Sequence, residues 1–366
     1  MASHVAVEVF HPGEYVADEM EARGWAQDDL AEVLGVSRQS VVKLLQGKSA
    51  VTPEMSMRLA AAFEQTAQTW MNLQVAYELA KVAKEDRDTA RRAEVFSRVP
   101  VREMKRRNWL EGDQDVDALE DSVCQFLGIR NIKEPLAFAA AARMSTAEMT
   151  SSHGTWCCRV RNLSPFVTAT KYDDGVDACI RELKPLMAYP EDVAKVPSVL
   201  ADFGIRLVIV EHLKGTRIDG VATWVNDCPV IGMSLRYDRI DNFWFTLLHE
   251  LVHVKYRDEC PVDVDLLSRS DRDVPEMEKR ADTEAATNLV DSTRLDSFIQ
   301  RHEPLFYQKK IIQFAQARKV HPAIIVGQLK HLKKVPQTHL NKLQAKIREN
   351  LIGKTITDGW GDVPVV

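Results

Sequence analysis

The sequence predicts a mostly α-helical protein with a small β-sheet, an α+β fold. Apolar residues recur at helical spacing over residues 11–80 and again from Asp241 onward. Between these regions lie three β-branched runs, at 205–210, 221–225 and 230–235, and turn residues bound each of them. The chain has 366 residues, and at about 100–200 residues per domain it has room for two or three domains.

The composition is that of an ordinary globular protein. Apolar residues make up 45% and charged residues 28%, which excludes a largely disordered, a collagen-like or a disulfide-stapled chain. The net charge is −5, so any nucleic-acid surface must be local. The N-terminus lacks a basic region followed by an apolar run, and no segment approaches the ~20 apolar residues of a membrane span. We therefore expect a cytoplasmic protein with no membrane partner.

Charge and composition divide the chain into four parts. Residues 1–85 are predicted to form an all-helical domain. A stretch rich in charge follows, and we expect a charged linker with connecting helices over 86–150. Residues 151–350 contain the β-branched runs and the later helices, and they form the second domain. Residues 351–366 are rich in glycine and proline, and we expect a flexible tail there.

The most informative pattern in the N-terminal domain is QDDLAEVLGVSRQSVVKLLQ, at 27–46. Ala31 is small enough to let two helices approach closely, and Gly35 suits a turn that needs a positive φ. Ser37 can cap the second helix. The outward positions carry hydroxyl, amide and cationic groups and no acid, which suits base edges in a major groove. We predict that DNA is read by Ser37, Arg38, Gln39, Ser40 and Lys43, with Gln27 on a phosphate.

The segment from His11-Pro12-Gly13-Glu14 to Trp70-Met71-Asn72-Leu73-Gln74 resembles the HigA-like branch of the XRE helix-turn-helix family. That family consists of antitoxins and autorepressors that usually bind palindromic operators as dimers. The resemblance implies a homodimeric regulator of transcription, at a toxin–antitoxin or stress locus, with double-stranded operator DNA as its partner. Ala26 departs from the family, which more often has Thr or Ser there, so one cap or phosphate contact is missing. The alternative is a helical bundle that binds protein.

The second informative pattern is His249-Glu250-Leu251-Val252-His253, an H-E-x-x-H sequence. Four residues of a helix turn through ~400°, so both imidazoles lie on one face, where they can bind one Zn²⁺. Glu250 lies ~100° further round the helix, within reach of a metal-bound water. The flanking residues are apolar and predict a buried helix. Burying His249, Glu250 and His253 there without a metal would leave polar groups unsatisfied, which costs free energy. The alternative is a pair of surface histidines.

A third zinc ligand is expected on the helix that follows. Glu278 and Asp282 are four residues apart and share a face with Ala281 and Ala285, which would let this helix pack closely on the first. We assign Glu278 as the third ligand and Asp282 as the acceptor for the N–H of a ligand histidine. Glu276 is the second choice for the ligand. The alternative for the acidic pair is a solvated helix face.

These residues, together with Ile231–Tyr237 and Asp241–Leu247, resemble the ImmA/IrrE metallopeptidase family over roughly 155–335. The Glu-x-x-x-Asp spacing is similar to that of the gluzincins, in which the Glu ligates zinc. The resemblance implies a gluzincin-like zinc endopeptidase domain, often one that cuts or regulates an XRE-type repressor. Leu289-Val290-Asp291 departs from the Leu-Leu-x-Pro end that members often have, so we expect this helix to end differently from theirs.

We expect water-activated amide hydrolysis at this site. A zinc ion on the three ligands would lower the pKa of its water toward ~7, and Glu250 would take that proton and later give it to the leaving amine. If 230–235 forms an edge strand, an extended substrate could pair with it. The residue that stabilises the oxyanion stays open among His321, Tyr237 and Tyr256.

Three interpretations of the whole chain follow. The favoured one is a bacterial DNA-binding regulator whose zinc endopeptidase domain cleaves or senses a regulatory protein, such as a cognate toxin, a repressor or this chain itself. In the first alternative the chain is an antitoxin-like binding protein, and its metallopeptidase fold is a non-catalytic docking module. Glu250 argues against that, because a scaffold has no use for a base. The second alternative is a plain protease that docks substrates on its helical domain.

Overall fold

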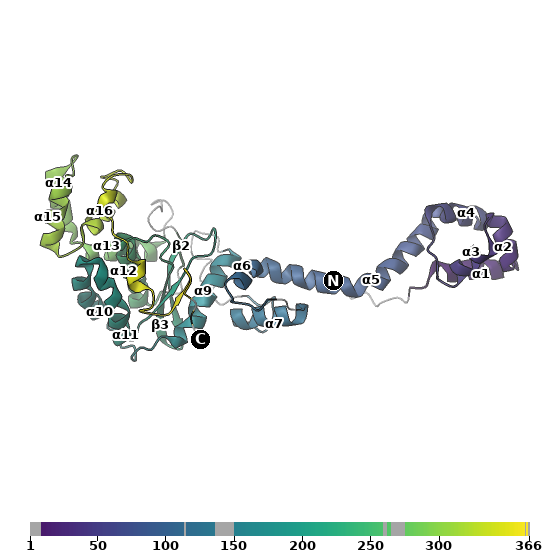
Figure 1. Ribbon diagram of the computed structural model, residues 1–366, viewed down its shortest axis with the longest axis horizontal. Helices are drawn as coiled ribbons and strands as arrows, with labels where there is room; N and C mark the ends of the chain where they lie inside the picture. The colour runs from purple at the N-terminus through teal and green to yellow at the C-terminus, as the bar shows by residue number, and fades with distance from the viewer. Residues whose placement is uncertain are drawn as a thin grey trace. The chain divides into compact units, whose positions relative to one another are not determined.

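The computed structural model describes residues 9–112, 115–135, 150–258, 262–264, 275–362 and 364. The chain divides into two compact units, Met1–Ala93 and Glu94–Val366 (Figure 1). The division falls within helix α5 (Ala67–Arg98). Most of the described residues are helical and the strands form one small sheet, so the predicted fold class is confirmed.

The first unit is a bundle of short helices whose ends follow from the sequence. The Thr52 hydroxyl accepts a hydrogen bond from the Met55 N–H (3.2 Å), and Pro53 follows in the first helical position. The inward positions bury a continuous core that includes Val16, Leu30, Val41, Leu59 and Trp70. The helices before α5 are α1 (Pro12–Arg23), α2 (Gln27–Leu34), α3 (Arg38–Leu45) and α4 (Pro53–Phe63).

Helices α6 (Val101–Arg106) and α7 (Val116–Leu127) belong to the second unit. Their apolar residues share a core with α9 (Ser151–Leu163), and the rings of Trp109 and Phe126 stack at 5.8 Å. The stretch predicted over 86–150 as a charged linker with connecting helices does contain helices, but from Glu94 on its described residues belong to the second unit and do not form a linker. In this stretch the described charged side chains from Glu94 on are exposed or half-buried, whereas most apolar ones are buried. Residues 136–149 of that stretch lie outside the described residues.

The sheet has the strand order β4-β2-β3-β1-β5. Strands β2 and β3 form an antiparallel hairpin, whose turn residues Asn226 and Asp227 both have positive φ, as a tight hairpin turn requires. Strand β1 pairs in parallel with both β3 and β5, and β4 pairs antiparallel with β2. The strands are β1 (Arg206–Val210), β2 (Ile218–Val225), β3 (Cys228–Met233), β4 (Val262–Val264) and β5 (Thr357–Asp358).

Strand β3 lies inside the sheet, between β2 and β1, so the condition set for substrate pairing, that 230–235 forms an edge strand, is not met. The backbone of β3 hydrogen-bonds to a strand on each side and leaves no edge for a substrate. The physical reason is visible in its composition. Val230, Ile231 and Met233 are apolar and buried on both faces of the strand, a pattern typical of interior strands.

Helices cover both faces of the sheet (Figure 1). Leu207 and Ile209 of β1 contact the core beneath α12 (Ile240–Tyr256), whereas Val208 and Val210 contact the core beneath α9. This alternation is the period of two that strand geometry dictates. The helices packed on the α12 side include α10 (Val176–Leu183), α11 (Val196–Asp202), α13 (Glu276–Leu289), α14 (Ser292–His302), α15 (Gln308–Arg318) and α16 (Pro322–His331).

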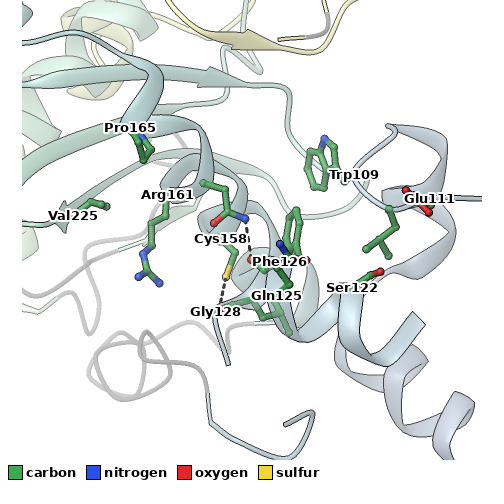
Figure 2. A pocket seen from close by; sticks show the side chains of 13 residues that line it. Trp109, Glu111, Ser122, Gln125, Phe126, Gly128, Cys158, Arg161, Pro165 and Val225 are labelled. Atoms are coloured by element: carbon green, nitrogen blue, oxygen red, sulfur yellow. Dashed lines mark hydrogen bonds between the residues drawn. The ribbon is translucent and has the colours of Figure 1, made fainter. Parts of the chain in front are cut away.

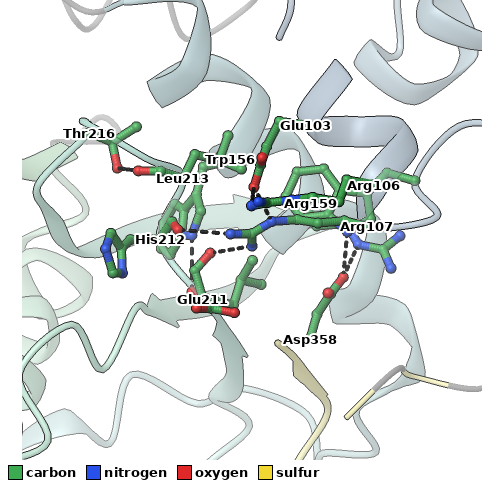
Figure 3. Close-up of polar contacts among 12 residues, drawn as sticks. Glu103, Arg106, Arg107, Trp156, Arg159, Glu211, His212, Leu213, Thr216 and Asp358 are labelled. Carbon is green, nitrogen blue, oxygen red and sulfur yellow. Dashed lines mark hydrogen bonds and ion pairs between the residues drawn. The ribbon is translucent and has the colours of Figure 1, made fainter. Parts of the chain in front are cut away.

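The C-terminal residues are anchored, so the prediction of a flexible tail over 351–366 is wrong for its described part. After α17 (Arg348–Leu351), β5 adds to the sheet, and Asp358 is 4% exposed. Its Oδ2 accepts a hydrogen bond from Trp109 Nε1 (2.8 Å). The same oxygen accepts one from Arg159 Nε (2.5 Å), which Figure 3 shows. Both partners are far away in the sequence, so the composition of the tail alone could not reveal them.

The described residues include no helix that is both long enough and apolar enough to cross a membrane.

Candidate functional sites: a nucleic-acid interface and a metal centre

The first candidate site is the turn between α2 and α3. Ala31 is buried where the two helices meet, and Gly35 has a φ of 63°, the left-handed conformation that the turn was predicted to need. The Ser37 hydroxyl accepts a hydrogen bond from the Ser40 N–H (3.2 Å) and so caps α3. The local sequence therefore determines both the angle and the start of the second helix.

The residues predicted to read DNA lie at the N-terminal end of α3 and on its outer face. Ser37, Arg38, Gln39 and Lys43 are exposed, whereas Ser40 is half-buried. Gln27 is half-buried at the first position of α2. The Arg38 guanidinium lies 3.3 Å from an Asp28 carboxylate oxygen, and both side chains are mostly exposed, so this ion pair holds Arg38 only weakly.

The second candidate site lies on α12, which packs against β2 and β3. His249 and His253 are one turn apart and fully buried, with Glu250 fully buried between them. Ala281 and Ala285 of α13 are also fully buried, as expected for small residues that let this helix approach closely. The close approach brings the Glu278 carboxylate, 1% exposed, next to both imidazoles.

Three groups converge on one point in this site. The Nε2 atoms of His249 and His253 are 3.0 Å apart. The Glu278 carboxylate lies 3.3 Å from His249 Nε2 through Oε2 and 3.7 Å from His253 Nε2 through Oε1. Ligand atoms about 2.0–2.1 Å from a tetrahedral zinc lie roughly 3.3–3.4 Å from one another. The spacing of the three groups therefore fits a zinc ion.

The far side of each imidazole faces a carboxylate. His253 Nδ1 donates to Asp258 Oδ2 (2.8 Å), and His249 Nδ1 lies 2.9 Å from Asp282 Oδ1. A carboxylate can only accept, so the hydrogen bond to Asp258 places the ring proton of His253 on Nδ1, and the proximity of Asp282 favours the same tautomer for His249, in which Nε2 presents a lone pair. Two lone pairs and the Glu278 carboxylate then face one another in a buried site. Such a set of acceptors is able to hold a cation at its centre.

Glu250 lies under strand β2 and faces Gly220. A Cβ added at Gly220 would lie 2.1 Å from Glu250 Oε1 and 2.9 Å from the Thr246 methyl group. Only glycine at this position leaves room for the carboxylate. The Glu250 side chain is fully buried in that space.

The structure decides between the two carboxylates considered for the third ligand. The Glu276 side chain is 90% exposed and accepts a hydrogen bond from Lys279 (2.9 Å), whereas Glu278 faces the histidines. Helix α13 starts at Glu276, so Glu276 and Glu278 lie ~200° apart around it.

The residues considered for the oxyanion make other contacts. The Tyr256 hydroxyl donates to Glu284 Oε1 (2.7 Å). His321 caps α16, accepting at Nδ1 from the Ala323 N–H (3.2 Å), and its burial lowers its pKa. The Tyr237 ring lies under the Arg236 guanidinium at 4.3 Å. These contacts do not single out one of the three, and the oxyanion residue stays open.

Three residues beside the metal site were missed from the sequence: Asp258, Arg280 and Gly220. Asp258 follows α12 directly and touches His253, and Arg280 donates to both oxygens of Asp258 (2.7 Å each). Burial raises the pKa of the Asp258 carboxyl, but hydrogen bonds from His253 and Arg280 outweigh burial and hold that pKa below its ordinary value. The acidic residue five positions after the second histidine was a signal that could have been followed.

A surface pocket of about 630 Å³ lies between α7 and α9 (Figure 2). Trp109, Phe126 and Arg161 line it, and Asn162 Nδ2 donates to the Phe126 carbonyl at its wall (2.9 Å). It lies on the α9 side of the sheet, whereas the histidines lie on the α12 side. No predicted site residue lines it.

Comparison with known proteins identifies the first unit. A helix-turn-helix family model matches residues 16–70. The uncharacterized HTH-type transcriptional regulator YddM of Escherichia coli K12 is 30% identical over 73 residues, 20% of this chain and 78% of that protein. Virulence-associated protein I of Dichelobacter nodosus is 32% identical over 80 residues, 22% of this chain and 73% of that protein. The chain therefore belongs to the family of helix-turn-helix transcriptional regulators.

Solved structures similar to the chain cover the same small share of it. PA4674 of Pseudomonas aeruginosa, in complex with its operator DNA, is 33% identical and covers 21% of this chain and 84% of its own, with a TM-score of 0.21. The antitoxin HigA of Pseudomonas aeruginosa, with the higBA promoter, is 31% identical, and the match covers 21% of this chain and 90% of the HigA chain, with a TM-score of 0.20. The family assignment rests on the sequence relatives.

Proposed function

We propose that the chain is a HigA-like, operator-binding regulator whose second unit is a zinc-dependent endopeptidase that acts on a regulatory protein. The observation that carries the enzymatic half is the convergence of His249, His253 and Glu278 within one buried site. Their ligand atoms all lie within 4.8 Å of one another. The observation that carries the DNA half is the exposed, acid-free end of α3 next to a capped turn.

The first unit binds double-stranded operator DNA with α3 in the major groove. Arg38 and Gln39 are exposed at the start of α3, where side chains of a recognition helix contact base edges. Lys43, one turn further along, and Gln27 on α2 can reach phosphates. A homodimer on a two-fold symmetric operator is the arrangement that such units use.

The chemistry at the second site is hydrolysis of a peptide bond. His249, His253 and Glu278 would hold the zinc ion, which would supply a Lewis acid for the activation of water. Glu250 accepts the proton of the attacking water on a carboxylate oxygen and passes it to the nitrogen of the leaving amine. Asp258 and Asp282 keep the ring proton of each ligand histidine on Nδ1. The substrate is a polypeptide, such as a cognate toxin or a repressor.

A non-catalytic docking module is the second candidate, and the buried carboxylate of Glu250 weighs against it. A docking surface needs no carboxylate in its interior, and burying a carboxylate is costly. Gly220 leaves the space in β2 that this carboxylate fills. The combination of Glu250 and Gly220 is best explained by a requirement for a carboxylate beside the histidines.

Metal analysis of the full-length protein beside His249→Ala tests the zinc site. We expect one zinc per chain in the wild type and none in the variant. Incubation with the products of neighbouring genes, candidate toxins or repressors, tests the peptidase. Zinc retention without cleavage of any such protein, in wild type and Glu250→Gln alike, would favour the docking module.

A further inference from the structure

We infer that Asp258 and Arg280 form a clamp that makes His253 a competent metal ligand and holds the helix of Glu278 against the helix of the histidines. Both are positioning residues, since neither touches the centre of the site. The inference rests on the zinc site proposed above. It adds Asp258 and Arg280, which are not part of the H-E-x-x-H motif or of the Glu278–Asp282 pair.

The backbone turn that ends α12 aims Asp258 back at the ring of His253. Arg257 has a φ of 52°, and its N–H donates to the Val254 carbonyl (3.2 Å) while the Asp258 N–H donates to the His253 carbonyl (3.0 Å). This pair of bonds is the Schellman motif that closes many helices. A left-handed conformation at an arginine costs energy that glycine would avoid. Asp258 is therefore tied to His253 twice, through its backbone and through its carboxylate.

Arg280 links this turn to α13. Its Nη2 donates to both oxygens of Asp258 (2.7 Å each), and its guanidinium carbon lies 3.9 Å from the centre of the Tyr256 ring. The Tyr256 hydroxyl in turn donates to Glu284 of α13 (2.7 Å). Two contacts from α13, one turn apart, thus hold the last turn of α12. Because α13 also carries Glu278, these contacts set the distance between the third ligand and the histidines.

Arg280 also balances the charge of the site. The metal cluster and its neighbours contain the carboxylates of Glu250, Glu278, Asp258 and Asp282, and mutual repulsion would push them apart. The guanidinium of Arg280 contacts both oxygens of Asp258 and offsets the negative charge of that carboxylate. Asp258 accepts the Nδ1 proton of His253 through Oδ2, so Nε2 is the ring atom of His253 that faces the proposed metal position. Among its described contacts Asp282 has no such cation, and its side chain is 27% exposed.

The experiment measures zinc affinity in full-length protein, by competition with a chromophoric chelator, for the wild type, Asp258→Asn and Arg280→Gln. Loss of a carboxylate behind a ligand histidine costs 10–100-fold in metal affinity, and we expect that range for Asp258→Asn. Arg280→Gln should lose about 10-fold. Lys279→Gln is the matched control, because Lys279 lies on the same helix and pairs only with the exposed Glu276 among its described contacts. It should bind zinc as the wild type does.

A second measurement reads the histidine directly. In metal-free protein labelled with ¹⁵N-histidine, we expect His253 with its proton on Nδ1, and a shift toward the other tautomer in Asp258→Asn; His253→Gln assigns the signal. Asp258→Glu, which keeps the carboxylate, should retain more affinity than Asp258→Asn. The clamp would be overturned if Asp258→Asn and Arg280→Gln both kept the zinc affinity and the His253 tautomer of the wild type. A fall in thermal stability alone, with affinity and tautomer unchanged, would overturn it as well. A wild type that binds no zinc but has the Nδ1 tautomer would overturn the proposed enzyme instead.

Discussion

The two candidate sites place polar side chains in opposite surroundings. At the start of α3, Ser37, Arg38 and Gln39 are exposed, adjacent in sequence and weakly held. At the metal site, His249, Glu250 and Glu278 are buried and come from different helices. This difference in burial suits the two sites to different kinds of ligand. An exposed set can adapt to a partner that brings its own charges, whereas a buried set must be fixed beforehand by its neighbours.

The largest effect is expected at the buried base. Glu250→Gln keeps the shape of the side chain beside Gly220 but removes the proton acceptor. Cleavage of a substrate protein should fall by about 10²–10⁴-fold while zinc content and thermal stability stay unchanged. Gel analysis of cleavage, with zinc measured on the same samples, checks this. Full activity in the variant would remove Glu250 from the mechanism.

Removal of metal should change the unfolding of one unit and leave that of the other unchanged. Zinc that binds only the folded state adds about 4 kcal/mol at a thousand times its dissociation constant, so a chelator should lower the unfolding temperature of the second unit. The first unit contains none of the ligands and should unfold as before. Calorimetry of the full chain with and without chelator measures both transitions. The His249→Ala protein serves as control, since the chelator should leave its transitions where they are.

Gly220→Ala should disturb the buried site by packing alone. The new Cβ would meet Glu250 Oε1 and the Thr246 methyl group, and overpacking of this kind costs about 1–3 kcal/mol. We expect lower stability of the second unit, by denaturant titration, and slower cleavage. Gly112→Ala is the matched control, because a Cβ there meets nothing within 4 Å. Equal stability of the two variants would mean that β2 does not constrain Glu250.

Arg38→Ala should weaken operator binding without affecting the metal site. A bidentate contact to a base contributes about 1–3 kcal/mol, which corresponds to roughly 5–150-fold in affinity. Fluorescence anisotropy with DNA from upstream of the chain's own gene measures it at fixed salt. Arg294→Ala removes the same charge from an exposed position on the second unit and should leave affinity unchanged. If both variants bind alike, α3 does not read the DNA.

The smallest effect is expected from the cap of α3. Ser37→Ala removes the acceptor of the Ser40 N–H, and lost caps cost about 1 kcal/mol. The midpoint for denaturant unfolding of the first unit should fall slightly, and that of the second should not move. A Ser37→Asp variant, which restores an acceptor, should recover the stability. It should also bind DNA less well, because it adds an anion to the reading surface.

The sequence by itself determined the features that depend on neighbouring residues. The Gly35 turn, the Ser37 cap and the spacing of His249 and His253 on one helix face follow from backbone geometry and local hydrogen bonds. These rules act within a few residues, so no knowledge of the rest of the chain is needed. The mixture of helices and β-branched runs was likewise enough to predict the fold class.

The tertiary structure decided what depends on partners distant in the chain. It favoured Glu278 over Glu276, because the orientation of α13 on α12 determines which carboxylate is buried. It also placed β3 inside the sheet and attached the C-terminal residues to Trp109 and Arg159. Each of these outcomes depends on packing and charge pairing between segments that meet only in the folded chain, and composition or periodicity within one segment does not encode them.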